Sequence, residues 1–311
     1  MQPRREPPRR RGPALITALS DGGPQPRLRV HAVHPGALAA TGWQGLAAAL
    51  PADVAVQVVS LDAIEPYVTA ADPVRRDRAD DPDMRDLAAH VVSALPEPDG
   101  VPYVLVGWSF GGVVAAAAAH AAPRRPHLLV LLDSIAPVSH FTVNDDTLVD
   151  GDMLMRWFGM YLCAKRDTRL PPGTDLGGAD DDERLRRLLS WCTANGVLSA
   201  GTPMSGFVKL FRSFLGGLSR NNRIVSGYRP AAIDVPTVLF KPVGSLLPEH
   251  GPLGWPELTR SGFSQLPCAG DHYTMLSEPS GWRLVADLIK QYQPSRTGDV
   301  PQRRPVPASI T

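Results

Sequence analysis

The chain has 311 residues, of which 43% are hydrophobic, and its formal net charge is +1. That apolar fraction supports a sizeable core and excludes a wholly disordered chain. The longest apolar run, within residues 113–119, is far shorter than the roughly 18 residues of a membrane-spanning helix, so no membrane span is expected. Three widely spaced cysteines argue against a disulfide framework or a zinc cluster. They fit a reducing compartment and predict a cytoplasmic protein without a bound metal.

The near-neutral total hides an uneven distribution of charge. Residues 1–13 carry a net charge of +4 and residues 294–311 carry +2, so the segment between them is acidic, at −5. Both ends are rich in proline and lack hydrophobic periodicity, which predicts disordered tails at 1–27 and 294–311 around one domain at 28–293. A basic arm for nucleic acid is an alternative interpretation of the N-terminal tail, but a solvated tail is simpler, and no nucleic-acid partner is predicted.

Between the tails, predicted strands alternate with predicted helices. In chain order these are a strand at 28–34, a helix at 43–50, a strand at 54–61, a helix that is capped by Asp81-Pro82 and ends at Pro96, a strand at 103–106, an alanine-rich helix to about 122, strands at 128–132, 235–240 and 262–266, and a helix at 282–292. This alternation implies parallel crossovers, and the continuous apolar strands imply helices on both faces of the sheet. The prediction is an α/β fold with a mostly parallel sheet.

About 100 residues between positions 134 and 234 lack strand signals. Helical patches lie at 152–163, 183–192 and 208–218. An insertion of this size between two core strands predicts a helical lid at about 138–233. Its large apolar side chains either line a pocket or pack on one another, and helical spacing favours neither interpretation: they are Met153, Trp157, Phe158, Met160, Tyr161, Trp191, Phe207, Phe211 and Phe214.

The strongest chemical motif lies where the strand at 103–106 meets the alanine-rich helix. Residues 107–111, Gly-Trp-Ser-Phe-Gly, match Gly-x-Ser-x-Gly in the strand–turn–helix setting of a nucleophile elbow. Glycines two residues before and after Ser109 let strand and helix approach, so that the hydroxyl projects from a strained turn. The helix N-terminus points its amides at developing negative charge. The alternative is a plain tight turn, but this setting favours the elbow.

A nucleophilic serine needs a general base and an acid that orients the base. His272 is the predicted base, because it follows the last weak strand and comes after Ser109 and the acid in the chain order of this motif. Asp133 is the predicted acid, because it ends the strand after the elbow helix, where ligand-facing residues of parallel sheets lie. A turn or cap residue is the alternative for Asp133. Asp234 precedes its strand, and Asp271 cannot easily fold back onto the adjacent ring.

An oxyanion hole needs two backbone donors. The N–H of Phe110, the residue after the nucleophile, is one prediction. The other donor should come from the loop after the first core strand, and the N–H of Ala37 is chosen there, although residues 34–36 are also compatible with a simple turn.

Four blocks of sequence together resemble the thioesterases of polyketide and nonribosomal-peptide biosynthesis. They are His-Pro-Gly at 34–36, Gly-Trp-Ser-Phe-Gly-Gly at 107–112, Leu-Leu-Asp-Ser-Ile-Ala-Pro at 131–137 and Gly-Asp-His-Tyr-Thr-Met-Leu at 270–276. The resemblance covers about residues 28–292. It implies an α/β-hydrolase fold with a helical lid, the triad Ser109, Asp133 and His272, and oxyanion donors at Ala37 and Phe110. The chain departs from the family at 36–38, where Gly-Ala-Leu stands in place of the usual Gly-Gly.

The resemblance also implies a function. A serine thioesterase of this kind releases an acyl, polyketide or peptidyl chain from the phosphopantetheine thioester of a carrier protein through a serine acyl-enzyme, by hydrolysis or macrocyclisation, in antibiotic biosynthesis. The implied partner is an acyl or peptidyl carrier protein or a synthase module. No cofactor is expected, because the substrate arrives on the phosphopantetheine arm of the carrier.

Other classes of function remain as alternatives. An ester or lipid hydrolase would use the same triad. An acyltransferase would also use it, but such enzymes typically carry histidine before the nucleophilic serine, where this chain has Trp108. The non-enzymatic alternative is a catalytically idle binding module, and the intact Ser–Asp–His order argues against it.

Overall fold

The computed structural model describes residues 14–72, 74–75, 81–95, 99–142 and 150–293. In these residues seven strands form one sheet, in the order β1-β3-β2-β4-β5-β6-β7. Only β1 is antiparallel to its neighbour. The strands are β1 (Ile16–Asp21), β2 (Leu28–His34), β3 (Val54–Ser60), β4 (Tyr103–Trp108), β5 (Leu128–Leu132), β6 (Thr237–Gly244) and β7 (Phe263–Asp271). The mostly parallel sheet predicted from the sequence is confirmed.

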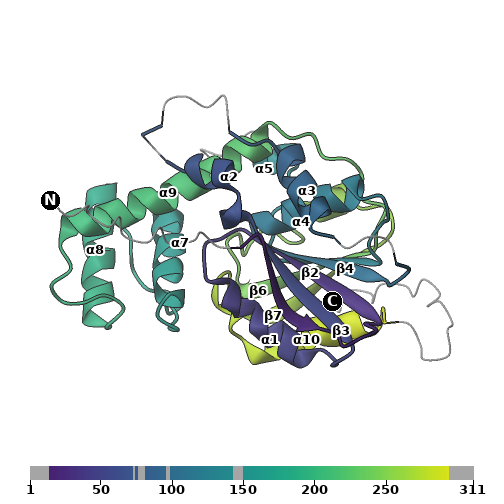
Figure 1. Ribbon diagram of the computed structural model, residues 1–311. Coiled ribbons are helices and arrows are strands. Elements are labelled where there is room, and N and C mark those ends of the chain that lie inside the picture. Colours follow the sequence, from purple (N-terminus) through teal and green to yellow (C-terminus); the bar gives the residue numbers. More distant parts are fainter. Residues whose placement is uncertain (1–13, 73, 76–80, 96–98, 143–149, 294–311) are drawn as a thin grey trace, which may run out of the picture.

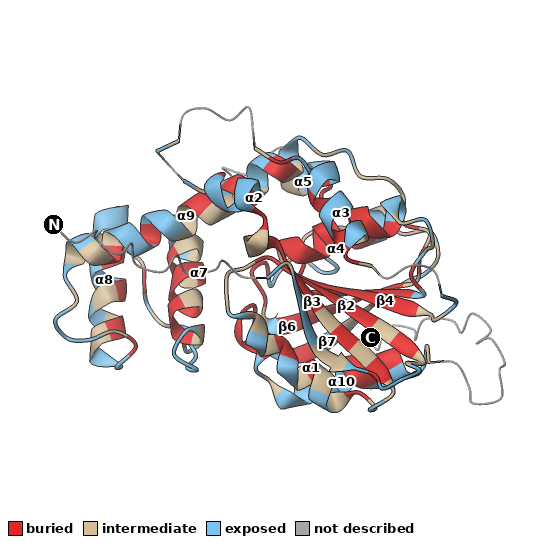
Figure 2. Ribbon diagram, viewed as in Figure 1, coloured by how far each residue is buried: buried red, intermediate tan, exposed pale blue. Residues whose placement is uncertain are grey.

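Helices cover both faces of this sheet (Figure 1). Helices α1 (Gln44–Ala49) and α10 (Pro279–Lys290) lie on one face, and α3 (Met84–Ser93) and α4 (Phe110–Ala121) lie on the other. Every residue of β4 and β5 is buried as a result (Figure 2). Their continuous apolar sequences are what a strand covered on both faces requires.

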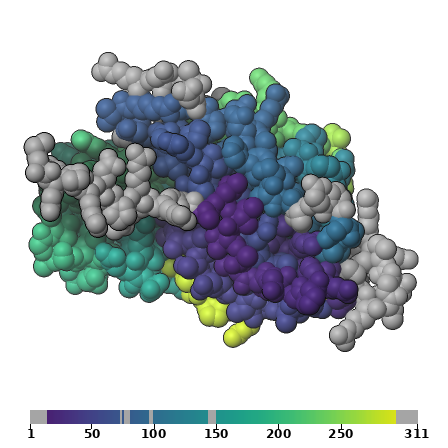
Figure 3. All heavy atoms as spheres, in the orientation of Figure 1, coloured from purple at the N-terminus to yellow at the C-terminus, as the bar shows by residue number. Residues whose placement is uncertain are grey.

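The inserted segment is helical. Helices α7 (Gly151–Ala164), α8 (Asp181–Ala194) and α9 (Met204–Ser226) form a lobe beside the sheet (Figure 3), and α9 continues from this lobe towards the short helices α2 (Glu65–Thr69) and α5 (Ser139–Thr142) (Figure 1). Helix α9 extends well beyond the predicted 208–218. The architecture is that of an α/β-hydrolase with a helical insertion.

Two predictions about segments were wrong. Residues 16–21, assigned to a disordered tail at 1–27, form β1, because they pair with the free edge of β3 from Ile16 opposite Val59 to Asp21 opposite Ala55. The predicted cap Asp81-Pro82 is also displaced. Asp83 caps α3, and its carboxylate accepts hydrogen bonds from two N–H groups of the first turn, at 2.7 and 2.9 Å. The predicted tails at 1–13 and 294–311 lie outside the described residues.

Candidate active site

Ser109 lies in a strained turn between β4 and α4. Its backbone has φ 54° and ψ −131°, a conformation that L-residues rarely adopt. A Cβ atom on Gly107 would lie 2.4 Å from the Cα of Gly112, and one on Gly111 would lie 2.4 Å from the carbonyl oxygen of Val33. The glycines of the motif are therefore needed for close packing of strand on helix, as the elbow prediction requires.

Asp133 and His272 meet at the same edge of the sheet. Asp133 follows the last residue of β5, and His272 follows the last residue of β7. The two side chains are buried, and Nδ1 of His272 lies 2.8 Å from Oδ2 of Asp133. Asp133 also has a positive φ, of 41°, which turns its carboxylate out of the line of the strand. With Ser109 at the end of β4, three strands bring the three predicted residues to one edge.

The loop after β6 adds contacts that sequence reasoning missed. The hydroxyl of Ser245 donates to Oδ1 of Asp133 at 2.6 Å, and the N–H of Leu246 donates to Oδ2 at 3.2 Å. With the hydrogen bond to His272, both carboxylate oxygens have partners, which holds the Asp133 side chain in one orientation. No signal in the sequence indicates Ser245, because the predicted strand ends at residue 240 and the contact with Asp133 spans 112 positions.

The backbone around His272 is fixed from three sides. Its N–H donates to Gly244 O at 3.0 Å, and its carbonyl oxygen accepts from Nε1 of Trp108 at 2.8 Å. Asp271 accepts hydrogen bonds from the N–H groups of Tyr273 and residue 274 at 2.9 and 2.8 Å. The carboxylate of Asp271 therefore closes the turn that presents His272, which agrees with its rejection as the orienting acid.

The two predicted oxyanion segments lie against each other. Phe110 is the first residue of α4, and a Cβ atom on Gly111 would lie 3.3 Å from Cδ of Pro35, so the loop that carries Ala37 lies beside the start of the helix. Tyr67, which the sequence analysis did not single out, bridges the two. Its ring stacks on that of Phe110 with centroids 5.9 Å apart, and its hydroxyl lies 3.4 Å from Pro35 O.

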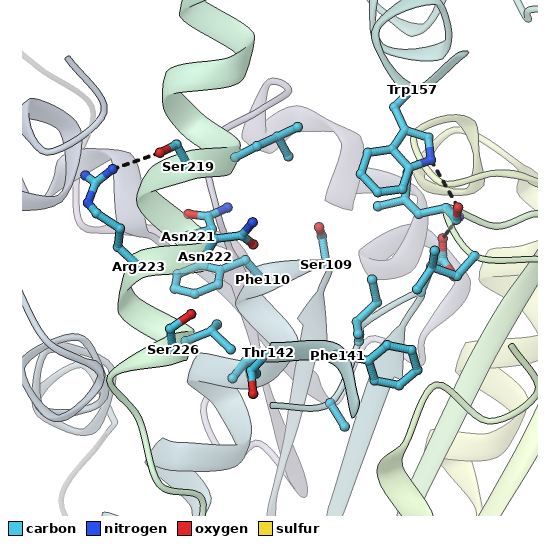
Figure 4. A pocket seen from close by; sticks show the side chains of 18 of the residues that line it. Ser109, Phe110, Phe141, Thr142, Trp157, Ser219, Asn221, Asn222, Arg223 and Ser226 are labelled. Carbon is cyan, nitrogen blue, oxygen red and sulfur yellow. Dashed lines mark hydrogen bonds between the residues drawn. The ribbon is translucent and has the colours of Figure 1, made fainter. Parts of the chain in front are cut away.

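A pocket of about 900 Å³ opens above Ser109, whose hydroxyl points into it (Figure 4). Asp133 lines it as well. One wall is apolar and includes Phe141 and Trp157. The facing wall is formed by α9 and includes polar side chains from two successive turns of the helix: Ser219, Asn222, Arg223 and Ser226. This set is called the polar stripe below.

The lid aromatics mostly pack on one another. Trp157 lines the pocket and donates through Nε1 to Leu246 O at 3.0 Å. Phe158 is the centre of a separate cluster, whose ring centroids lie 5.2 to 5.4 Å from its own: Phe207, Phe211 and Phe214. The sequence left both roles open, and the structure assigns packing to most of these residues because their face of each helix turns towards its neighbour.

Two further histidines lie in β2, beneath the oxyanion loop. Nε2 of His34 lies 2.8 Å from Leu38 O, and Nδ1 accepts from Nε1 of Trp43 at 3.2 Å, which fixes a neutral ring. Burial lowers the pKa of His34 and lowers that of His31 to about 3, with the nearby charge of Arg29 adding to the latter shift. Both histidines are therefore uncharged structural groups at neutral pH.

The described residues contain no cluster of side chains suited to a metal ion. None of their helices combines the length and the hydropathy that crossing a lipid bilayer requires.

One family model matches part of the chain. Residues 29–157 match the family model described as Thioesterase domain, a segment that includes Ala37, Ser109, Phe110 and Asp133 and ends before His272. No curated protein sequence matched the chain.

Solved structures with the same fold come from biosynthetic enzymes. A four-domain nonribosomal peptide synthetase, holo-AB3403 bound to AMP and glycine, superposes with a TM-score of 0.60 at 23% identity over 91% of this chain, which spans only 20% of that protein. The RedJ thioesterase of the prodiginine pathway in Streptomyces coelicolor gives 0.51 at 24% identity, over 86% of this chain and 87% of its own. The NocB thioesterase domain in covalent complex with a fluorophosphonate nocardicin G analog gives 0.50 at 22% identity, over 89% and 99%.

Because these structures are only 22–24% identical to the chain, they establish its fold alone. The similarity to thioesterases in sequence comes from the family model. The resemblance predicted from the sequence is confirmed in that residues 29–157 match the thioesterase domain model and the chain has the α/β-hydrolase fold.

Proposed function

We propose that the protein is a serine thioesterase that releases an acyl, polyketide or peptidyl chain from the phosphopantetheine thioester of a carrier protein. The observation that carries the proposal is the buried Asp133–His272 hydrogen bond at the same edge of the sheet as Ser109, whose hydroxyl points into the pocket. A pocket of about 900 Å³ is of the size that holds a chain of many atoms. The match of residues 29–157 to the thioesterase family favours a thioester over other acyl substrates.

In the proposed mechanism Asp133 accepts a hydrogen bond from Nδ1–H of His272, which holds the proton on Nδ1 and leaves Nε2 free to act as the general base. Nε2 takes the proton of the Ser109 hydroxyl as the serine oxygen attacks the thioester carbonyl. The oxyanion is stabilised by the N–H groups of Phe110 and Ala37. The C–S bond then breaks, His272 returns the proton to the departing thiolate, and the chain remains as an ester on Ser109.

The second half of the reaction decides the product. Water, activated by His272, gives the free acid, whereas a hydroxyl or amine at the far end of the same chain gives a macrocycle. Both routes use the same proposed triad. The pocket wall formed by α9 therefore decides which nucleophile reaches the ester.

The test is turnover of a panel of thioesters, either loaded on a carrier protein or as N-acetylcysteamine mimics of the pantetheine arm, with products identified by mass. We expect release of the chain as acid or macrocycle, and labelling of Ser109 by a fluorophosphonate. Ser109→Ala should abolish both, whereas Ser93→Ala, in which a hydroxyl bonded to His90 O on α3 is removed, should abolish neither.

Each alternative function has its own outcome in this experiment. Faster turnover of simple oxygen esters than of thioesters would indicate an ester or lipid hydrolase. Transfer of the chain to a second acceptor would indicate an acyltransferase. A folded wild-type protein that neither turns over nor is labelled would indicate a binding module.

A further inference from the structure

Helix α9 carries a buried charge that pairs with no carboxylate among the described residues. Arg220 is 9% exposed, and its guanidinium carbon lies 3.5 Å from the centroid of the Tyr67 ring. Nη1 donates to Tyr67 O at 3.1 Å and Nη2 to the Tyr67 hydroxyl at 2.7 Å. Burying a guanidinium is costly unless its donors are satisfied, and here Tyr67 satisfies two of them while its ring faces the cation.

Tyr67 in turn contacts both segments that are proposed to supply oxyanion donors. Its ring lies parallel to that of Phe110, with an interplanar angle of 7°. Its hydroxyl, which accepts from Arg220, lies 3.4 Å from Pro35 O and 3.1 Å from Oδ1 of Asn221. The side chain is fully buried, so water does not compete for these hydrogen bonds.

The contact between Arg220 and Tyr67 affects the loop at residues 34–37 through the Tyr67 hydroxyl. A hydroxyl that accepts a hydrogen bond from a cation becomes a stronger donor. The hydroxyl has one proton, which Asn221 Oδ1 at 3.1 Å and Pro35 O at 3.4 Å share. Donation to Pro35 O would fix the peptide plane that leads into Gly36, whose φ of 91° lies in the left-handed region. Ala37 follows directly, so the direction of its N–H depends on that plane.

We propose that Arg220 and Tyr67 are positioning residues for the oxyanion hole. They hold the 34–37 loop and Phe110 in the geometry that receives the developing charge, and they tie that geometry to α9, whose other side chains line the pocket. Displacement of α9 would thus change the catalytic geometry as well as the shape of the pocket. This proposal rests on the proposed function of Ser109.

A similar pair at the other end of β4 supplies a matched control. Tyr103 donates its hydroxyl to Arg124 O, and the Arg124 guanidinium lies over its ring at 5.3 Å. Tyr103 begins the strand that Ser109 follows, and it lines no part of the pocket. Tyr67→Phe and Tyr103→Phe each delete one tyrosine hydroxyl bonded to a backbone carbonyl beside an arginine, but only the first contacts the oxyanion segments.

The experiment measures kcat and KM of both variants on decanoyl-N-acetylcysteamine, together with the affinity for a decanoyl trifluoromethyl ketone, whose hydrated or serine-bound form mimics the oxyanion. For Tyr67→Phe we expect kcat to fall about tenfold, less than the 10²–10³-fold cost of deleting an oxyanion donor outright. KM should stay within about twofold, and ketone affinity should fall in parallel with kcat/KM. Tyr103→Phe should leave all three within about twofold.

Variants of Arg220 test whether the positioning effect depends on α9, the lid helix that carries this residue. Arg220→Met should lower kcat at least as far as Tyr67→Phe, and Arg220→Lys should recover part of the loss, because it keeps the charge but not the two-point contact. If Arg220→Met does not fold, Tyr67→Phe decides the question alone.

The outcomes separate the two proposals. Wild-type turnover with an unchanged kcat in Tyr67→Phe, or equal losses in the Tyr67 and Tyr103 variants, would overturn the positioning role and leave the thioesterase intact. A wild-type protein without turnover and without fluorophosphonate labelling would overturn both.

Discussion

The two walls of the pocket are built in different ways. The wall at the strand ends is held by the sheet: Ser109 N–H donates to Leu132 O, and Asp133 N–H donates to Phe240 O, both at 2.9 Å. The wall formed by α9 is one side of a single helix. In its polar stripe, Arg223 donates to the hydroxyl of Ser219 and to the carbonyl oxygen of Ala70, in the segment after α2. Backbone hydrogen bonds in the sheet keep the catalytic residues in fixed positions, which the reaction needs for every substrate. On a helix face, a single substitution can change which side chain meets the substrate without moving the backbone. We therefore expect losses of rate at the first wall and changes of selectivity at the second.

The largest effect should come from the acid at the strand-end wall. Asp133→Asn replaces the acceptor for Nδ1–H of His272 by an amide that also donates, so it favours the wrong histidine tautomer. We expect kcat to fall about 10⁴-fold with little change in KM. Asp234→Asn is the control, because Asp234 pairs with Arg125 before β6. Equal activity of the two variants would show that the strand-end wall does not carry the chemistry.

A smaller loss of kcat is expected from Ser245, whose hydroxyl is hydrogen-bonded to Asp133 and not to His272 or Ser109. Ser245→Ala removes the 2.6 Å hydrogen bond to Asp133, and a bond to a charged acceptor contributes roughly 1.5–3 kcal/mol. If part of this stabilisation acts in the transition state, kcat falls about tenfold. Ser134→Ala removes a neighbouring buried hydroxyl that has no partner in the described residues and should leave kcat unchanged. Equal kcat values for the Ser245→Ala and Ser134→Ala enzymes would show that the Ser245 hydrogen bond to Asp133 does not contribute to catalysis.

The polar stripe should change preference more than rate. Asn222→Leu combined with Ser226→Ala replaces two of the four polar side chains of the stripe on the wall that faces Trp157. One or two hydrogen bonds contribute about 0.5–1.5 kcal/mol each, so the ratio of kcat/KM for a hydroxylated over a plain acyl thioester should fall three- to tenfold. The matched control is Ser213→Ala, which changes an exposed residue of the same helix that does not line the pocket. An unchanged ratio with a lower overall rate would mean that the α9 wall serves the chemistry as the other wall does.

The contrast between the walls also explains what the sequence could predict. Ser109 and Asp133 were predicted because each follows a strand whose apolar run is visible locally, and His272 was predicted because it comes late in the chain order, after the last weak strand. Ser245 meets Asp133 across 112 positions, and Arg220 meets Tyr67 across 153, so no local pattern indicates either contact.

The lid aromatics and strand β1 also could not be assigned correctly from the local sequence. The periodicity of the lid aromatics is the same whether a helix face covers a neighbour or a pocket, so the pattern could not separate Trp157 from Phe158. Residues 16–21 are mostly exposed and become a strand only because the edge of β3 is available. In each case the deciding interaction is with a distant part of the chain.

The last prediction concerns the pH dependence of stability rather than the rate or selectivity of the reaction. Helices α7, α8 and α9 contain no histidine, whereas β2 holds His31, whose buried ring nitrogens have no hydrogen-bond partner in the described residues. The folded-state pKa of His31, about 3, lies below its ordinary value of 6.5, so between these values the unfolded state binds more protons. Stability is therefore full above pH 6.5 and falls as the pH drops below it, by up to about 1.4 kcal/mol per pH unit.

Urea unfolding at pH 7.5 and pH 5 tests this assignment. The difference in unfolding free energy between the two pH values should be smaller in His31→Phe than in the wild type. Any packing cost of the larger ring is common to both pH values and cancels in that difference. His120→Gln, at an exposed position of α4, is the control and should keep the wild-type difference. A His31→Phe protein that loses as much stability at pH 5 as the wild type would place the acid-sensitive group elsewhere.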